Sequence, residues 1–326
     1  MLQAIGPDLD GVVIATPHAT HYQVCKEVMG ELDRRKEAGE DRPLHILMEK
    51  PMSTDIQHAI ELYKMVHARD GKSRFWVNHS ANYREQTKLA RDIITSGRLG
   101  RIRHVTASFA SPLKWIFEDP ACKGWNEPSQ GMLGNGFAWG QSSHLFAFIY
   151  HICPQLEPVD VYGSLTHTPK TGADISFGAT IHCSDGREGV DGASDELAVL
   201  SVSGTSLLPG NAHSDPPVPK KAQIEVYGDE ASLHYEGNDR EPSSGRLEIR
   251  NAEGGVEVIH NEFHFENLDN EGSGPESLQN FVQMCCGSTD VYEGASVIDG
   301  LRSIQTIDAI YRSHASSSVE KIIGVE

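Results

Sequence analysis

The sequence lacks several features that would each place it in a specialised class of protein. It has no run of five lysines and arginines, and 46 acidic residues against 28 basic ones give a net charge of −18. An acidic chain without a basic patch argues against partners such as nucleic acid or an anionic membrane surface. No apolar stretch approaches the ~18 residues that a transmembrane helix needs. The first residues have neither the basic nor the long apolar region of a signal peptide, so we expect a cytoplasmic protein.

The cysteine pattern excludes two further classes. Six cysteines are spread through the chain without a CxxC motif, and the adjacent pair Cys285 and Cys286 lacks metal-ligand spacing. This pattern predicts free thiols in a reducing compartment. The histidine pair His18 and His21 has no apparent third ligand, so we expect no metal site.

Two short apolar segments are the most informative part of the chain. Residues 10–17 and 45–51 are runs rich in Val, Ile and Leu that end in polar, turn-forming residues. Runs without polar alternation are typical of parallel strands buried on both faces. Ligands of open parallel sheets bind at the carboxyl ends of the strands. Thr16 and Pro17 after the first run, and Glu49, Lys50 and Pro51 after the second, are therefore expected at the functional edge.

The order of the expected elements predicts an α/β fold in two parts. Strands over 10–16, 44–48 and 74–78 alternate with helices over 18–35, 55–69 and 85–96, which predicts a parallel, doubly wound sheet. Ser53 or Thr54 is the expected N-cap of the second helix. From residue 101 the pattern becomes that of a mainly antiparallel open sheet, with helices over 142–152, 276–284 and 293–313. Its further strands are expected over 159–166, 175–183, 197–203, 222–227, 232–235, 247–250 and 256–259.

Several motifs follow one another in an order that resembles a known family. They are residues 9–17 with His21, Glu49-Lys50-Pro51, Arg84 in the stretch 82–84, residues 96–102, His144, and residues 226–233. In this order they resemble the Gfo/Idh/MocA oxidoreductases, named after glucose–fructose oxidoreductase, inositol dehydrogenase and a rhizopine-catabolism protein. The resemblance covers the whole chain.

The resemblance implies a fold, a reaction and a cofactor. Residues 1–83 are expected to form a partial NAD(P)-binding Rossmann domain, and residues 84–326 an α+β domain for substrate binding and oligomerisation. The implied reaction transfers hydride between the nicotinamide of NAD or NADP and a sugar, a polyol or a related hydroxyl compound. The implied assembly is a homo-oligomer that forms through the C-terminal sheet.

The chain departs from the family pattern at two places. No strand with a glycine-rich phosphate turn precedes residue 10, so we expect an N-terminally truncated Rossmann sheet that lacks about two βα units, roughly 60 residues. The family often has an aspartate four residues before the catalytic histidine, and here that position is Gly140. The second departure bears on mechanism more than on family membership.

Lys50 and His144 are the expected catalytic residues. An ammonium group at the end of a buried strand can hydrogen-bond a substrate hydroxyl, and desolvation would lower its pKa toward a useful range. The resemblance places His144 near the nicotinamide, where an imidazole can take the hydroxyl proton. An isolated lysine or histidine of this kind is more often a solvated or structural residue, so both assignments depend on the positions of these residues within the family motifs.

The remaining site residues follow from the same register. The expected cofactor contacts are Thr16, Pro17, His21, Glu49, Lys50, Pro51, Asn78 and Arg84. The expected substrate contacts are Lys50, Trp125, Gln141 and His144. Trp115 and Trp139 are further candidates for the wall of a sugar pocket, although core packing explains any of these tryptophans equally well.

Two functions remain open at this point. The first is an NAD(P)-dependent oxidoreductase, for which Lys50 and His144 are the evidence, in an incomplete form of the chain. The second is a non-catalytic regulatory or interaction protein on the same fold, which Gly140 and the absent phosphate turn favour.

We expect the polypeptide 1–326 to bind NAD(P) poorly. In the strand order 3-2-1-4-5-6 of the Rossmann fold, residues 12–15 would form an exposed apolar edge. Such an edge lacks the backbone amides and the helix N-terminus that hold a pyrophosphate. Isothermal titration of the purified chain should show no tight binding, and micromolar affinity would overturn this expectation.

Overall fold

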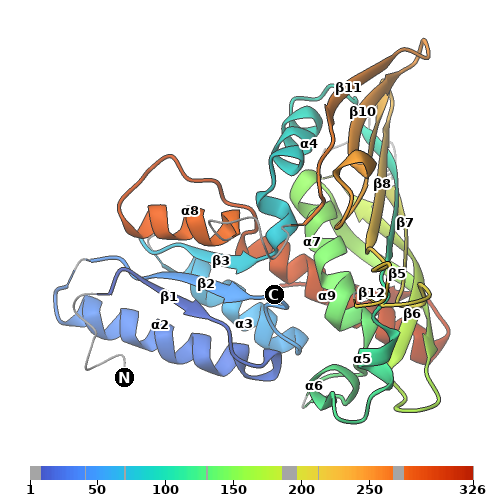
Figure 1. Cartoon of the computed structure of the whole chain (residues 1–326). Helices are drawn as coiled ribbons and strands as arrows, with labels where there is room; N and C mark the ends of the chain where they lie inside the picture. The colour runs from blue at the N-terminus through green and yellow to red at the C-terminus, as the bar shows by residue number, and fades with distance from the viewer. Residues whose placement is uncertain are drawn as a thin grey trace.

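The protein consists of two β-sheets that are connected through one long buried helix (Figure 1). The computed structural model describes residues 9–40, 42–69, 71–129, 131–185, 197–211, 213–266 and 275–325. The statements below concern these residues. None of their helices combines the length and the apolar character that are needed to cross a bilayer.

The first sheet is parallel, as the sequence predicts, and both of its faces are covered. It contains β1 (Gly11–Ile14), β2 (His45–Glu49) and β3 (Phe75–Asn78) in that order. The helices α2 (His21–Glu37) and α3 (Ile56–His67) lie on one face, and α8 (Glu276–Cys285) lies on the other (Figure 1). Alternate residues of β2 therefore enter different cores: Ile46 and Met48 face α2 and α3, whereas Leu47 packs with Phe281 of α8.

Strand β1 forms one edge of this sheet within the described residues. Val13 is 48% exposed, although strand valines are normally buried. A groove of about 550 Å³ runs between β1 and α2, and its lining includes Val12, Ile14, Val24 and Val28. The expected apolar edge is thus present in the part of the chain that the structure describes.

The second sheet has nine strands in the order β11-β10-β9-β8-β4-β7-β6-β5-β12. All neighbours are antiparallel except β4 and β7, which confirms the mainly antiparallel sheet. The strands are β4 (Ile102–Ala110), β5 (Glu157–His167), β6 (Asp174–Ser184), β7 (Ala198–Thr205), β8 (Lys221–Gly228), β9 (Ala231–Asn238), β10 (Arg246–Asn251), β11 (Val256–Asn261) and β12 (Glu320–Lys321).

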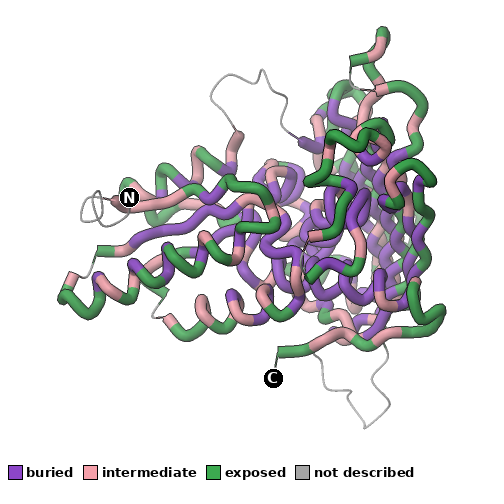
Figure 2. The backbone as a smooth tube through the Cα atoms, turned by 90° about the horizontal axis from the view of Figure 1, so that it is seen from below, coloured by how far each residue is buried: buried purple, intermediate pink, exposed green. Residues whose placement is uncertain are grey.

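Helices lie on the inner face of the nine-stranded sheet, and its strands carry exposed positions in alternation with buried ones (Figures 1 and 2). The other helices and turns are α4 (Glu85–Thr95), α5 (Lys114–Glu118), α6 (Lys123–Asn126), α7 (Ser143–Ile152), α9 (Val297–Ser316), a π-helical turn (Ala138–Ser142) and 3₁₀ turns (His18–Thr20, Ser80–Tyr83, Pro242–Ser244). The sequence did not predict α5, α6 or β12, because each is too short to show periodicity.

Helix α9 lies between the two sheets and is buried along most of its length. It approaches both sheets closely. A Cβ atom at Gly300 would lie 3.0 Å from both the Met52 sulfur and a Val77 methyl, and a Cβ at Gly163 of β5 would lie 3.1 Å from Ile310. The absence of side chains at these two positions lets one helix pack against both sheets.

The first turns of α9 and α3 differ from the sequence expectation. Helix α9 begins at Val297 rather than at 293, because Ser296 and Asp299 form a capping box that fixes the first turn. The N-cap of α3 is Asp55, whose carboxylate accepts hydrogen bonds from the amides of Gln57 and His58, so the expected Ser53 or Thr54 cap was wrong. A carboxylate is the stronger acceptor and also favours the helix dipole.

A Gly300→Val variant tests the close packing of α9. Three added carbons would press on Met52 and Val77, and overpacking of this kind costs about 1–3 kcal/mol of unfolding free energy. The matched control is Gly30→Val at an exposed position of α2, where an added Cβ meets no heavy atom within 4 Å. The control should raise the unfolding free energy by ~0.3 kcal/mol, because valine has a higher helix propensity than glycine. Urea unfolding measures both, and equal midpoints would contradict the tight packing.

Candidate active site at the carboxyl edge of the parallel sheet

Lys50 connects the two parts of the molecule at the end of β2. Its Nζ donates a hydrogen bond of 2.8 Å to the main-chain carbonyl of Gly140, and the Lys50–Pro51 peptide bond is cis. Gly140 lies in the π-helical turn that precedes α7. The ammonium group of the first sheet is therefore held by the backbone of the second part.

The Gly140 carbonyl oxygen accepts a second side-chain hydrogen bond within the π-helical turn. The side-chain amide of Gln141 donates to the same oxygen at 3.1 Å, so two side-chain donors use its two lone pairs. A Cβ at Gly140 would lie 3.2 Å from the ring of Trp125, so this ring takes the space that a side chain at position 140 would need. π-Helical turns are frequent at functional sites.

Trp125 also covers the charge of Lys50. The Nζ of Lys50 lies 5.7 Å from the centre of a Trp125 ring, which is within cation–π range. The ring of His18, from the turn after β1, lies 5.7 Å from Trp125, so residues of both parts meet over the lysine. Burial, followed by the charges of His21 and Lys50, lowers the pKa of His18.

Burial dominates the electrostatics of Lys50. It lowers the pKa of the ammonium to about 8, whereas the carboxylates of Glu266 and Glu49 act in the opposite direction. Lys220 adds to the lowering, and its own Nζ is paired with Glu266 at 2.7 Å. A lysine near pKa 8 carries its proton at neutral pH and can release it within the physiological range.

His144 is the second residue of α7, and it is partly buried. Its Nδ1 is buried and has no hydrogen-bond partner among the described residues. Burial and then the charge of Lys50 lower the pKa of its imidazole well below the usual range. His144 is therefore neutral at physiological pH, which is the form of imidazole that accepts a proton.

The residues after β1 divide into exposed and buried groups. Thr16 and Pro17 are exposed at the end of the strand, whereas His21 is buried. The two ring nitrogens of His21 lie 2.8 Å from the carbonyl oxygens of Thr16 and Pro51. His21 thus connects the ends of β1 and β2, and no ring nitrogen is left for a ligand.

Two further expected residues have other partners. Glu49 accepts a 2.5 Å hydrogen bond from the amide of Asn78, and it acts on Lys50 through its charge alone. Arg84 forms an ion pair of 2.9 Å with Glu276 at the start of α8. The structure thus places Arg84 against α8.

The other tryptophans differ from Trp125. Trp139 is buried and stacks on Tyr311 with ring centres 6.2 Å apart, as expected of a core residue. Trp115 is 44% exposed on α5.

Sequence reasoning missed three charged or histidine neighbours of Lys50. His79, Lys220 and Glu266 all act on the site, but they come from three distant segments. Only His79 carried a signal, because it directly follows the expected site residue Asn78 at the end of β3.

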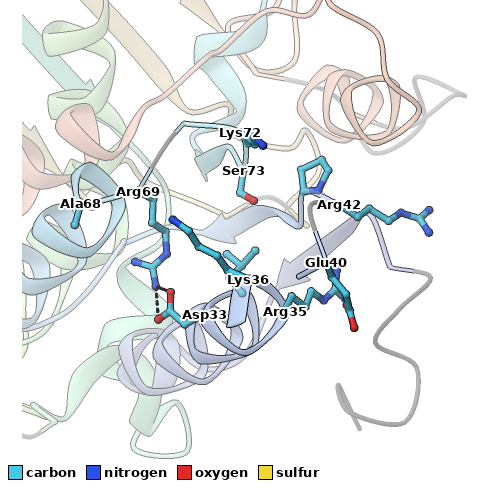
Figure 3. A pocket seen from close by; sticks show the side chains of 11 residues that line it. Asp33, Arg35, Lys36, Glu40, Arg42, Ala68, Arg69, Lys72 and Ser73 are labelled. Carbon is cyan, nitrogen blue, oxygen red and sulfur yellow. Dashed lines mark hydrogen bonds and ion pairs between the residues drawn. The ribbon is translucent and has the colours of Figure 1, made fainter. Parts of the chain in front are cut away.

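A basic pocket of about 310 Å³ lies at the opposite end of the parallel strands (Figure 3). Its lining includes Arg35, Arg42 and Arg69, but these side chains have acidic partners. Arg69, for example, is paired with Asp33 at 2.9 Å. The segments that line the pocket precede β2 and β3 in the chain. The pocket therefore lies at the amino ends of these strands, remote from the carboxyl edge that holds Lys50.

Comparison with known proteins agrees with this geometry. Residues 2–79 match the model of an oxidoreductase family with an NAD-binding Rossmann fold, and residues 87–234 match that of the GFO/IDH/MocA C-terminal domain. The chain belongs to the Gfo/Idh/MocA oxidoreductase family. The resemblance inferred from the motifs and the two-part fold are thereby confirmed.

Solved structures of Gfo/Idh/MocA-like fold extend the comparison. An NAD-binding oxidoreductase from Klebsiella pneumoniae is similar with a TM-score of 0.70 and 16% identity over 99% of this chain and 82% of that one. The transcriptional regulator Gal80p from Kluyveromyces lactis is similar with a TM-score of 0.65 and 14% identity over 98% and 75%. At such identities the likeness concerns the fold alone.

A relative by sequence is an uncharacterised oxidoreductase of Synechocystis. It is 24% identical over 146 residues, which make up 44% of this chain. The match covers 34% of the relative's length.

The titration of Lys50 tests the electrostatics of the site. NMR of the protein with ¹³C-labelled lysine should show Lys50 titrating near pH 8. Glu266→Gln should lower the pKa of Lys50 further, because the variant removes a carboxylate that raises it. The variant also leaves the positive charge of Lys220, which lowers the pKa of Lys50, without its ion-pair partner. The control Glu253→Gln, on the exposed turn between β10 and β11, should leave it unchanged. A Lys50 pKa near the ordinary ~10.4 would contradict this account.

Proposed function

We propose that this chain is a cytoplasmic, homo-oligomeric NAD(P)-dependent oxidoreductase that acts on a hydroxyl group of a sugar, a polyol or a related compound. The observation that supports it best is the meeting of Lys50, Gln141 and Trp125 at the carbonyl of Gly140, one helical turn before His144. These residues bring a cation, an amide and an aromatic face together beside a neutral imidazole.

The residues at the carboxyl edge fit the nicotinamide end of the cofactor. Thr16 and Pro17 are exposed after β1, and Glu49, Lys50, Pro51 and Asn78 lie at the ends of β2 and β3. The buried Oε1 of Gln141 has no partner among the described residues, as expected of a group that faces a ligand. Of the expected cofactor residues, His21 would act indirectly by holding the strand ends, and Arg84 by holding α8. When bound, the nicotinamide supplies the hydride acceptor.

Lys50 and His144 have complementary roles in this proposal. The Lys50 ammonium hydrogen-bonds the substrate hydroxyl and stabilises the negative charge that develops on its oxygen. The neutral imidazole of His144 takes the hydroxyl proton. Trp125 presents a flat face to the carbon skeleton and excludes water from the ammonium.

A non-catalytic regulatory role is the second candidate. Gly140 replaces an acidic residue that is frequent in the family, and the fold is shared with a transcriptional regulator. In this alternative, the carboxyl edge binds a small ligand without turnover, and its occupancy alters contacts with a partner protein.

Substitution of the two proposed catalytic residues distinguishes the candidates. With a panel of sugars and polyols and either nucleotide, Lys50→Ala and His144→Ala should each lower the rate of nicotinamide reduction about 10²–10⁴-fold. Activity should also decline above pH 8, as Lys50 loses its proton.

Lys64→Ala and His213→Ala, at exposed positions, serve as controls and should keep full activity. A panel without turnover while the cofactor is demonstrably bound would argue against the enzyme. Biological activity that survives both active-site substitutions would support the regulatory alternative.

A further inference from the structure

Buried polar atoms without partners are concentrated in two stretches of the chain. Within the described residues, the stretch from Trp76 to Tyr83 and the stretch from Trp139 to His144 contain many of the buried side-chain nitrogens and oxygens that lack a hydrogen bond. Such atoms are unfavourable in a folded protein unless water or a reacting group completes them. The unpartnered atoms of Gln141, His79 and His144 belong to residues that act on Lys50 or on the carbonyl that it binds.

His79 is the most unusual member of this group. It lies directly after β3 and is 1% exposed, and neither of its ring nitrogens has a partner among the described residues. Two other buried histidines use both nitrogens: His21 contacts two carbonyl oxygens, and His151 contacts Tyr292 and Asp299. Ordinary core packing therefore does not account for the environment of His79.

The ring of His79 packs against the ring of His144. The ring centres are 5.8 Å apart and the planes meet at 85°. The nitrogens of His79 and the Nδ1 of His144 are all buried, whereas the Nε2 of His144 is not among the buried unpartnered atoms. The buried Nδ1 of His144 and the two buried nitrogens of His79 thus belong to two rings in contact, and Nε2 is the nitrogen of His144 that a substrate can reach.

Both imidazoles are neutral at physiological pH. Burial, followed by the charge of Lys50, lowers the pKa of His79 to about 3, and the same causes act on His144. A neutral imidazole has one donor and one acceptor nitrogen, and the partner of one nitrogen fixes the role of the other. The two rings make no direct hydrogen bond, but one water can connect them, because it can accept from one ring and donate to the other.

We propose that His79 is a positioning residue that holds His144, through one bridging water, in the tautomer with its proton on Nδ1. Nε2 of His144 then lacks a proton and is free to accept one from the substrate hydroxyl. This inference rests on the proposed function for the role of His144, but the tautomer itself exists without cofactor or substrate.

Nitrogen NMR of the full chain labelled with ¹⁵N-histidine tests the inference at neutral pH. The signals of His144 and His79 are assigned from their absence in His144→Gln and His79→Phe. In the wild type, His144 should be protonated on Nδ1. In His79→Phe, which keeps a flat ring but removes both nitrogens, the proton should move mainly to Nε2. His79→Gln, which keeps a group that can bind the water, should retain the Nδ1 proton.

His45→Phe is the matched control, since it removes another buried imidazole at the amino end of β2, away from the carboxyl edge. It should lower the melting temperature but leave the His144 signals unchanged. A wild-type His144 protonated on Nε2 would overturn the inference without any variant, as would an unchanged tautomer in His79→Phe. An Nδ1 proton in a protein that shows no turnover would leave the inference standing and count against the proposed function.

Discussion

The burial of α9 between two sheets is the constraint on which the rest of the structure depends. A helix that is covered on nearly all sides cannot move relative to either sheet without exposing apolar surface. Gly300 and Gly163 remove the side chains that would keep the sheets apart. The shared core therefore fixes the carboxyl edge of the small parallel sheet against the π-helical turn of the larger part, with the precision that a hydrogen bond from Lys50 to Gly140 requires.

The burial of Lys50 in turn sets the protonation of the site. Removing an ammonium group from water favours its neutral form, so Lys50 has a pKa near 8 even with Glu266 and Glu49 nearby. Its remaining positive charge disfavours protonation of His144 and His79. Burial and the charge of Lys50 thus together keep the imidazoles of His144 and His79 neutral. The polar atoms left without partners around it reduce stability, and a functional site is the usual reason why a fold tolerates such a cost.

Position 140 has no side chain that could contact Lys50. Its carbonyl oxygen accepts the hydrogen bond from Lys50, and Trp125 occupies the space beside it. The aromatic ring meets His18 from the turn after β1, so contacts between the two parts enclose the lysine. The exposed edge of β1 lies in the same parallel sheet. There the apolar strand residues lack the cover that α2, α3 and α8 give to the faces of the sheet.

The sequence by itself determined the longer elements and the strand ends at which the candidate site lies. Continuous apolar runs, helical periodicity and strand alternation are local properties, and they predicted the parallel sheet, the mainly antiparallel sheet and the strand ends that hold Thr16 and Lys50. Local pattern could not predict the short α6 that carries Trp125, the cap at Asp55, or the grouping of His79, Lys220 and Glu266 around Lys50. Only the tertiary structure decided these, because burial and charge act through space between segments that are distant in the chain, and a histidine or glutamate looks the same in sequence whether or not it faces a buried ammonium.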